Sequence, residues 1–268
     1  MSSIGIVGAG RMGLPMARRL AEAGHTVTAL SRNDDAGDRL REAGVRPVSD
    51  IGEVAEAGTD MILIAVLTDD QVREVCLAGP LTERIRPGTT LVIHTTGSPR
   101  TTQDIAAAFE PRGITVLDAA VSGGPHNIAA GDLTLFVGGP AEAVDAVSPL
   151  LGVYADPIIH AGALGAGQCV KLVNNALFTA QIGAVRAAVE LGAALGVQEQ
   201  ALLSALPHAS SDSRALAGAA RRGSVGAFVD SVAEFVGKDV ATVRAVAGEL
   251  GADLGPLDPL IAYGCPDS

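Results

Sequence analysis

The stretch that decides the fold lies at the start of the chain, where residues 4 to 13 read Ile4-Gly5-Ile6-Val7-Gly8-Ala9-Gly10-Arg11-Met12-Gly13. The first four residues are β-prone, and a helical pattern follows the glycines and stops at Gly24. A second β-prone run occupies residues 26–30. This order of strand, glycine turn, helix and strand predicts the opening unit of a Rossmann-type α/β fold with a doubly wound parallel sheet.

The glycines of this turn each have a physical role in binding a dinucleotide. Gly8 permits the tight turn, Gly10 lets the backbone approach a pyrophosphate, and Gly13 allows close packing of the helix. Backbone N–H groups at the start of the helix are free to bind the anion. We therefore predict a dinucleotide site at Gly8, Gly10, Arg11, Met12 and Gly13. A plain strand-to-helix turn is the alternative.

The end of the second β-prone run bears on which dinucleotide binds. An acidic residue there would bind the ribose hydroxyls of NAD, but the sequence reads Ser31-Arg32-Asn33. A hydroxyl and a guanidinium suit a ribose 2′-phosphate, so we predict Ser31, Arg32 and Asn33 as cofactor contacts and favour NADP over NAD. The alternative is that Arg32 stacks on adenine or faces solvent. We expect Asp34 and Asp35 to cap the next helix.

Strand and helix patterns continue to alternate after this unit. Further β-prone runs occupy residues 61–65, 90–93, 114–117, 133–137 and 157–160, with helix starts at Thr68 and Pro99 and a helix over 141–150. Ligands of such sheets bind at the carboxyl ends of the strands. The loops that fall there are Leu67-Thr68, Thr95-Thr96 and Ser122-Gly123-Gly124. We expect Leu67 to contact the cofactor. Ser122 lies between residues that favour a turn, and a turn without a binding role is the alternative for it.

A long apolar segment from Gly165 to Leu195 has no proline and is followed by Gly196. Its small and apolar residues recur at three- and four-residue steps, which predicts one continuous helix with one buried face. The residues of this predicted face are Leu172, Ala176, Thr179, Gly183, Ala187 and Leu191.

Lys171 and Asn175 stand four residues apart near the start of this helix, so they share one face of it. The alternative is a pair of solvated polar residues. Composition argues for a chemical role, because the chain has two lysines, Lys171 and Lys238, against 17 arginines. A lysine amine can lose its proton when partly desolvated, as a base must, whereas arginine stays protonated.

Composition excludes several classes of function. A formal net charge of −11 and the absence of long Lys/Arg runs oppose binding to nucleic acid or to an anionic membrane surface. The three cysteines lack C-x-x-C spacing, so we expect no metal site, no disulfide framework and a reduced, cytoplasmic location. The longest apolar run, residues 61–67, is too short to span a bilayer, and no basic leader precedes Ile4.

The pattern predicts a dinucleotide-binding domain at 1–163, a long interdomain helix at 164–196 and a small all-α domain at 197–268. Helical patterns in the last part cover residues 201–206, 215–222 and 228–250. A domain of this size is too small to bury the apolar faces of its own helices, so we expect these helices to pack on the long helix or on a second copy of the chain. A homodimer or higher homo-oligomer is therefore expected.

Several segments resemble, in order, the motifs of the β-hydroxyacid dehydrogenases, the family of 3-hydroxyisobutyrate dehydrogenase. Residues 8–17 resemble its N-terminal signature, Thr95-Thr96-Gly97-Ser98-Pro99 its Ser-Thr loop, and residues 118–124 its substrate loop. The segment from Gly165 through Lys171 and Asn175 resembles its catalytic helix. Phe235, Lys238 and Asp239 resemble its last motif.

This resemblance implies an oxidoreductase that transfers hydride between NADP or NAD and a small 3-hydroxy acid or its semialdehyde. Lys171 would be the acid/base and Asn175 would orient it and the substrate. Ser122 with the amides of Gly123 and Gly124 would hold the substrate carboxylate. Thr96 and Lys238 would lie beside the nicotinamide.

The chain also departs from the pattern of this family. Arg19 stands where the family usually has Asn, and Pro125-His126-Asn127 is bulkier than usual. His126 is a candidate substrate contact or a surface residue. Two other functions stay open: an imine reductase, and a non-catalytic cofactor-binding regulatory protein of the same fold. Both would be expected to lack Lys171.

Overall fold

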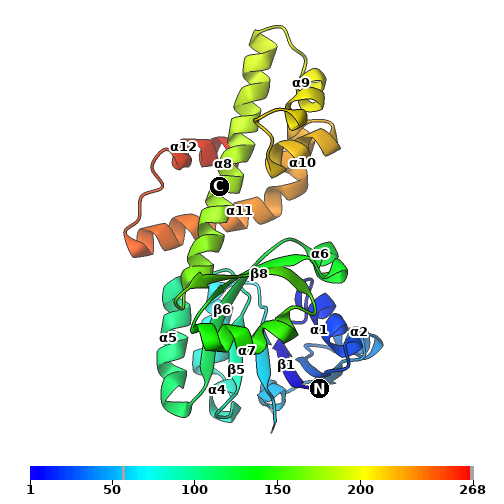
Figure 1. Cartoon of the computed structure of the whole chain (residues 1–268), viewed down its shortest axis with the longest axis vertical. Helices are drawn as coiled ribbons and strands as arrows, with labels where there is room; N and C mark the ends of the chain where they lie inside the picture. Colours follow the sequence, from blue (N-terminus) through cyan, green and yellow to red (C-terminus); the bar gives the residue numbers. More distant parts are fainter. Residues whose placement is uncertain (56–57, 266–268) are drawn as a thin grey trace. The chain divides into compact units, whose positions relative to one another are not determined.

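The computed structural model describes residues 1–55 and 58–265. The chain divides into two compact units, Met1–Lys171 and Leu172–Ser268 (Figure 1). The first unit holds the whole sheet, and the second is helical. The α/β fold with a long helix and a helical C-terminal part is therefore confirmed.

The first unit is built on one sheet of eight strands in the order β3-β2-β1-β4-β5-β6-β7-β8. The strands are β1 (Ser3–Val7), β2 (Thr26–Leu30), β3 (Arg46–Val48), β4 (Met61–Ile64), β5 (Thr90–Ile93), β6 (Thr115–Ser122), β7 (Leu133–Gly138) and β8 (Ala155–Gly162). The predicted strands are all present. The sequence analysis missed β3, and it missed that β7 runs antiparallel to β6.

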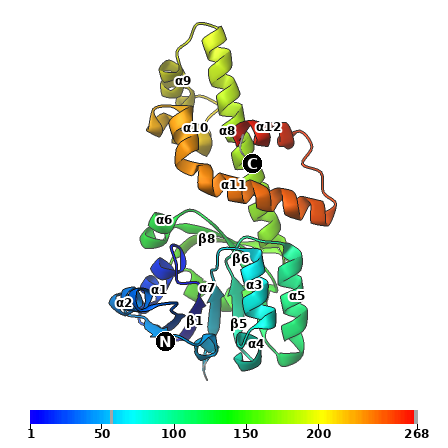
Figure 2. The ribbon, with the colours of Figure 1, turned by 180° about the vertical axis from the view of Figure 1, so that it is seen from behind.

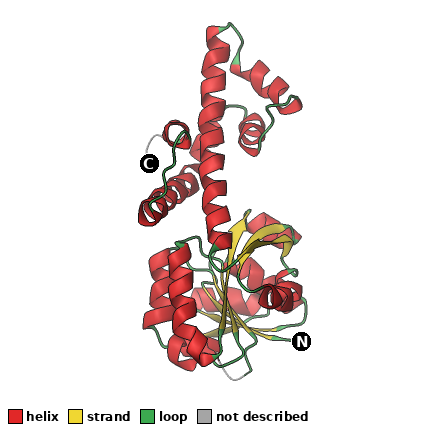
Figure 3. Cartoon of the chain, turned by 60° about the vertical axis from the view of Figure 1, so that its left-hand side comes forward, coloured by secondary structure: helices red, strands yellow, loops and turns green. Residues whose placement is uncertain are grey.

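Helices cover both faces of this sheet, as the yellow strands between red helices show in Figure 3. On one face α1 (Gly13–Glu22), α2 (Asp34–Glu42), α6 (Pro125–Ala130) and α7 (Ala141–Leu151) contribute to one apolar cluster. On the other face α3 (Asp69–Arg73) and α5 (Pro99–Phe109) contribute to a second, with α4 (Leu81–Arg84) beside them (Figure 2). Strand β4 serves both clusters, because Met61 and Leu63 point to one face and Ile62 and Ile64 to the other.

The second unit has a core of its own. Helix α8 (Ala166–Ala194) begins in the first unit and continues through the second, where α9 (Glu199–Ala205), α10 (Arg214–Arg222), α11 (Val225–Leu250) and α12 (Leu257–Gly264) follow. Leu172, Ala176 and Ile182 of α8 share one apolar cluster with residues of α10 and α11. Ser213 and Ser224 cap α10 and α11 through their side chains, which explains where those helices begin.

The predicted buried face of α8 is correct only in its first half. Leu172, Ala176, Thr179 and Gly183 are buried, but Ala187 and Leu191 are exposed. The buried face changes because the packing partner changes: a Cβ on Gly183 would overlap α12 at the Leu260 carbonyl, whereas one on Gly192 would overlap Leu202 of α9. Helix α12 itself was missed by the sequence analysis. No helix within the described residues is long and apolar enough to cross a membrane.

Candidate functional site

The three glycines of the turn between β1 and α1 differ in how closely the rest of the protein packs against them. Gly8 has a φ of 100°, and a Cβ there would overlap the Ala65 carbonyl oxygen. A Cβ on Gly13 would overlap the carbonyl oxygen of Gly8. A Cβ on Gly10, in contrast, would meet no atom within 4 Å. Gly8 and Gly13 are therefore required by the packing of the protein, and Gly10 faces open space.

The N-terminus of α1 beside this space has no side-chain cap. Met12 occupies the N-cap position and makes no side-chain hydrogen bond to the helix. Arg11, which precedes it, is exposed. Backbone N–H groups at the N-terminus of a helix favour an anion through hydrogen bonding and the helix dipole. The open space at Gly10 and the uncapped helix together fit the pyrophosphate of a dinucleotide.

The three predicted 2′-phosphate contacts, in the segment after β2, differ from one another in their surroundings. Ser31 Oγ donates to the Asn33 carbonyl oxygen (2.8 Å), and Asn33 Oδ1 accepts from Ala36 N (2.9 Å) as the N-cap of α2. Arg32 is exposed. The prediction that Asp34 and Asp35 cap this helix is therefore wrong, because Asn33 caps it and the two aspartates lie in its first turn.

The loops after β4 and β5 are tied to each other. Leu67 is 66% exposed. The sequence predicted a helix start at Thr68, and the structure shows that Thr68 and Gln71 form a capping box that starts α3. Thr95 Oγ1 donates to the Val66 carbonyl oxygen (2.9 Å). Asp69 accepts from the Ser98 N–H (3.1 Å) and from Thr101 Oγ1 (2.5 Å). Thr96 thus lies in a loop that is held from both ends.

Helix α8 is bound to the same loop through the buried side chain of Gln168. Its Nε2 donates to the Thr95 carbonyl oxygen (2.8 Å), and its Oε1 accepts from the Gly97 N–H (3.0 Å). Thr96 lies between these two backbone contacts in the sequence. The start of α8 and the predicted nicotinamide loop are therefore one hydrogen-bonded assembly.

Asp118 of β6 binds the first turn of α8. Its carboxylate accepts from the Gly165 N–H (2.6 Å) and the Gln168 N–H (2.7 Å), and also from the Gly167 N–H. Burial raises the pKa of Asp118, and these backbone N–H groups oppose the shift.

The predicted carboxylate loop, Ser122 to Gly124, ends β6. Gly123 has a φ of 130°, a conformation that favours glycine. The Gly124 N–H already donates to Asn127 Oδ1 (2.8 Å), so in this structure it is not directed to a ligand. Arg19 holds the far end of α6, where its Nη1 donates to the Ala129 carbonyl oxygen (2.9 Å). Arg19 therefore has a structural contact here, and His126 is exposed.

Lys171 and Asn175 lie one turn apart on α8, Lys171 partly exposed and Asn175 buried at 4% exposure. Asn175 Oδ1 accepts from Asn174 Nδ2 (3.3 Å). Within residues 1–55 and 58–265, Asn175 Nδ2 is a buried side-chain donor with no hydrogen-bond partner. An unsatisfied buried donor costs stability unless a water, an ion or a ligand pairs with it, so Asn175 Nδ2 is a candidate contact for a ligand.

Lys238, the second lysine, lies on α11 and is exposed. Its carbonyl oxygen accepts from Thr242 Oγ1 (3.0 Å), an ordinary contact one turn along the helix.

Sequence reasoning gave no role to Asp118, Gln168 or His94. Asp118 stands in the quoted substrate-loop segment, and that position was the only available signal. His94 is buried: its Nδ1 lies 2.6 Å from the Ala119 carbonyl oxygen and its Nε2 lies 2.8 Å from the Tyr154 hydroxyl. Since a carbonyl only accepts, Nδ1 carries the proton. Burial lowers the pKa of His94 to about 4.

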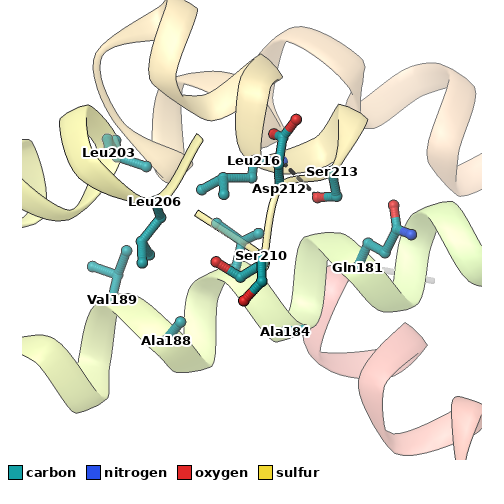
Figure 4. Close-up of a pocket in the computed structure, with 12 residues that line it drawn as sticks. Gln181, Ala184, Ala188, Val189, Leu203, Leu206, Ser210, Asp212, Ser213 and Leu216 are labelled. Atoms are coloured by element: carbon teal, nitrogen blue, oxygen red, sulfur yellow. Dashed lines mark hydrogen bonds between the residues drawn. The ribbon is translucent and has the colours of Figure 1, made fainter. Parts of the chain in front are cut away.

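A separate groove of about 290 Å³ lies in the second unit between α8 and the segment from Leu203 to Leu216 (Figure 4). Its lining is mainly aliphatic and includes no predicted site residue. Ser213 at its rim is engaged as the cap of α10. No group of three or more His, Cys, Asp or Glu side chains is placed to hold a metal ion in the part of the chain that the structure describes.

Two sequence families match consecutive parts of the chain. Residues 3–163 match the NAD-binding domain of 6-phosphogluconate dehydrogenase. Residues 165–257 match the family described as the NAD-binding part of NADP-dependent 3-hydroxyisobutyrate dehydrogenase.

Individual relatives agree with these families. The NAD-dependent L-serine dehydrogenase of Pseudomonas aeruginosa is 34% identical over 217 residues, which are 81% of this chain and 72% of that protein. The structure of Mycobacterium tuberculosis 3-hydroxyisobutyrate dehydrogenase with L-serine has a TM-score of 0.88 at 28% identity and covers 98% of this chain and 92% of its own. An imine reductase from Bacillus cereus, at 20% identity, a TM-score of 0.69 and coverage of 97% and 91%, shares the fold alone. The chain therefore belongs to the 3-hydroxyisobutyrate dehydrogenase-like group of the β-hydroxyacid dehydrogenase family, and is an NAD(P)-dependent dehydrogenase that acts on CH–OH groups.

Proposed function

We propose that Lys171 is the acid/base in the oxidation of a small 3-hydroxy acid, or in the reverse reduction of its semialdehyde or keto acid. The observation that carries this proposal is the buried Nδ2 of Asn175, one helical turn from Lys171. A donor left without a partner in the described protein, beside an amine that can exchange a proton, is the arrangement expected where a substrate hydroxyl or carbonyl oxygen binds.

In the oxidative direction the substrate loses its hydroxyl proton and a hydride from the same carbon. The nicotinamide, when bound, accepts the hydride. Lys171 Nζ in its neutral form takes the hydroxyl proton, and in the reductive direction the ammonium returns it. Asn175 Nδ2 donates to the substrate oxygen, which holds that oxygen in reach of Nζ throughout the transfer.

The substrate carboxylate is assigned to the loop after β6. The Ser122 hydroxyl and the Gly123 N–H are the proposed donors, and Gly124 joins them only by releasing Asn127. The names of the two relatives support a 3-hydroxy acid, since L-serine and 3-hydroxyisobutyrate both carry a hydroxyl on the carbon next but one to the carboxylate.

We assign NADP as the preferred cofactor, with Arg32 as the 2′-phosphate contact. No carboxylate stands at positions 31 to 33, and the side-chain bonds of Ser31 and Asn33 leave Arg32 as the charged group that extends into solvent there. The named Pseudomonas relative is NAD-dependent, so the proposed preference for NADP rests on residues 31 to 33 of this chain alone. The placement of Thr96, Leu67 and Lys238 beside the cofactor rests on the family resemblance.

A homodimer or higher homo-oligomer is part of the proposal. Leu191 and Leu195, near the end of α8, are 62% and 72% exposed, and a second copy would remove this apolar surface from water. Sedimentation of the purified protein measures the mass directly.

The decisive experiment is Lys171→Met in an assay of reduced-nicotinamide absorbance against a panel of 3-hydroxy acids and semialdehydes with both cofactors. We expect turnover to fall by about a hundredfold or more with dinucleotide affinity unchanged, as for removal of a positioned acid/base. The control is Arg222→Met, which removes one positive charge at an exposed position in the last turn of α10, a residue with no proposed role in the site. Ordinary turnover in Lys171→Met would remove this lysine from the mechanism and reopen the imine reductase and regulatory alternatives.

A further inference from the structure

Helix α8 begins without a capping side chain of its own. Gly165 precedes its first residue with a φ of 95° and carries no side chain. The first N–H groups of a helix need acceptors, which a Ser, Thr, Asp or Asn at the N-cap usually supplies. Here the acceptor comes from β6, because the Asp118 carboxylate binds the N–H groups of Gly165, Gly167 and Gln168.

The carboxylate is enclosed by backbone that only glycine allows. Asp118 is 0% exposed. A Cβ on Gly138 would overlap Asp118 Oδ1, and a Cβ on Gly167 would lie 2.7 Å from Asp118 Oδ2 and overlap the Phe136 carbonyl oxygen. The position of the first turn of α8 relative to β6 and β7 is thus restricted by close packing as well as by hydrogen bonds.

Gln168 extends this attachment to the loop after β5. Its side chain is 1% exposed and makes one bond to Thr95 and one to Gly97, while its own N–H binds Asp118. Gln168 is three residues before Lys171 on α8, which is less than one helical turn. Any shift or rotation of this turn would move Lys171 and the Thr96 loop together.

We infer that Asp118 and Gln168 are positioning residues for Lys171, which set its distance from the nicotinamide loop through the first turn of α8. This inference rests on the proposed function of Lys171. Neither side chain touches the reacting atoms in this scheme. Their effect comes from geometry, since a displacement on the order of 1 Å can slow an enzymatic step about a hundredfold.

The test compares Gln168→Met and Asp118→Asn with the wild-type enzyme. Met has a similar length and stays buried, but it removes both side-chain bonds to the loop. We expect kcat to fall by about tenfold or more in each variant, with dinucleotide Kd within about twofold. The matched control is Thr89→Val, which removes the buried bond from Thr89 Oγ1 to the Thr59 carbonyl oxygen (3.0 Å) at the opposite end of β5. It should lower stability without changing kcat.

A double-mutant cycle with Lys171→Met separates positioning from a general loss of structure. If Gln168 acts through Lys171, then Gln168→Met causes little further loss in the Lys171→Met enzyme, whose residual turnover is measured at high enzyme concentration. An equal loss in both backgrounds would overturn the inference, as would wild-type kcat in the two single variants. If Asp118→Asn does not fold, Gln168→Met and its cycle decide the outcome.

The two proposals fail in different ways. Full activity of Lys171→Met overturns the proposed function and the positioning role with it. An inactive Lys171→Met together with fully active Gln168→Met and Asp118→Asn overturns the positioning role alone.

Discussion

The chain contains two Gly-Ala-Gly segments that open helices, and the protein uses them in opposite ways. Gly8-Ala9-Gly10 leads into α1, and Gly165-Ala166-Gly167 leads into α8. In both, the first glycine has a positive φ, 100° at Gly8 and 95° at Gly165. At α1 the second glycine, Gly10, faces open space, whereas at α8 the second glycine, Gly167, lies against the buried carboxylate of Asp118.

The difference shows that the free N–H groups at the N-terminus of a helix can be bound either by an external anion or by an acceptor within the protein. Both helix ends present N–H groups and a positive partial charge. The end of α1 is left for a phosphate, and the end of α8 is occupied by an internal carboxylate. An external anion can leave and return, while an internal one holds Lys171 in place permanently.

The largest expected effect is that of Gly167→Ala on stability. The added methyl group would overlap the Phe136 carbonyl oxygen and crowd Asp118, so we expect the free energy of unfolding to fall by about 3 kcal/mol. Urea unfolding measures it. Gly226→Ala in α11, where a Cβ meets nothing within 4 Å, is the control and should not destabilise. Equal stability of Gly167→Ala and the wild type would mean that α8 is not closely packed at its start.

Gly10→Ala should show the opposite behaviour. Its methyl group enters the open space in front of α1, so the stability should stay within about 0.5 kcal/mol of the wild type. Because the methyl group would occupy space in which the backbone is expected to approach a bound pyrophosphate, we expect dinucleotide Kd to rise about thirtyfold, or about 2 kcal/mol. Titration calorimetry with NADP and NAD checks this. Unchanged affinity for both would place the pyrophosphate elsewhere and remove the contrast between the two helix ends.

Arg32→Asp tests whether the dinucleotide bound near α1 is NADP or NAD. The substitution replaces an exposed guanidinium with a like charge for the phosphate, and we expect NADP to bind about tenfold more weakly while NAD changes by less than about twofold. Arg39→Asp, an equal charge change at an exposed position within α2, is the control. Equal weakening of NADP and NAD would show that Arg32 is not a 2′-phosphate contact.

The smallest expected effect concerns pH and tests whether water reaches the buried side chain of His94. The pKa of His94 is lowered to about 4 by burial, so the unfolded chain takes up the proton first as pH falls below 6.5. Stability from this group is complete above pH 6.5 and is lost as the pH falls from 6.5 towards 4. We expect about 1 kcal/mol of this loss between about pH 6 and pH 5.

The measurement is urea unfolding of the wild type and of His94→Asn at both pH values. Asn can still donate to the Ala119 carbonyl oxygen but does not titrate in this range. Its stability should therefore depend less on pH than that of the wild type. An identical pH dependence would mean that His94 titrates normally, and that water reaches the backbone next to Asp118.

Local patterns predicted the elements that carry the site. The strand, turn and helix at residues 4–23 and the long helix of Lys171 were predictable because periodicity and glycine spacing are properties of neighbouring residues. The helix starts at Thr68 and Pro99 were predictable for the same reason. Asn33 was assigned to the cofactor, yet its side chain caps α2, because one side chain can serve either purpose and sequence does not rank them.

The sequence by itself therefore determined the fold class, the dinucleotide motif and the pair of residues on α8 proposed for catalysis. Tertiary structure alone decided which acceptor completes each helix. Asp118 is 47 residues from Gly165, and Gln168 is 73 residues from Thr95. Such contacts form only when the sheet places β5, β6 and α8 side by side, because a hydrogen bond depends on distance in space and leaves no period in the chain. The same Gly-Ala-Gly letters thus become an open anion site in front of α1 and a closed, internally capped turn at the start of α8.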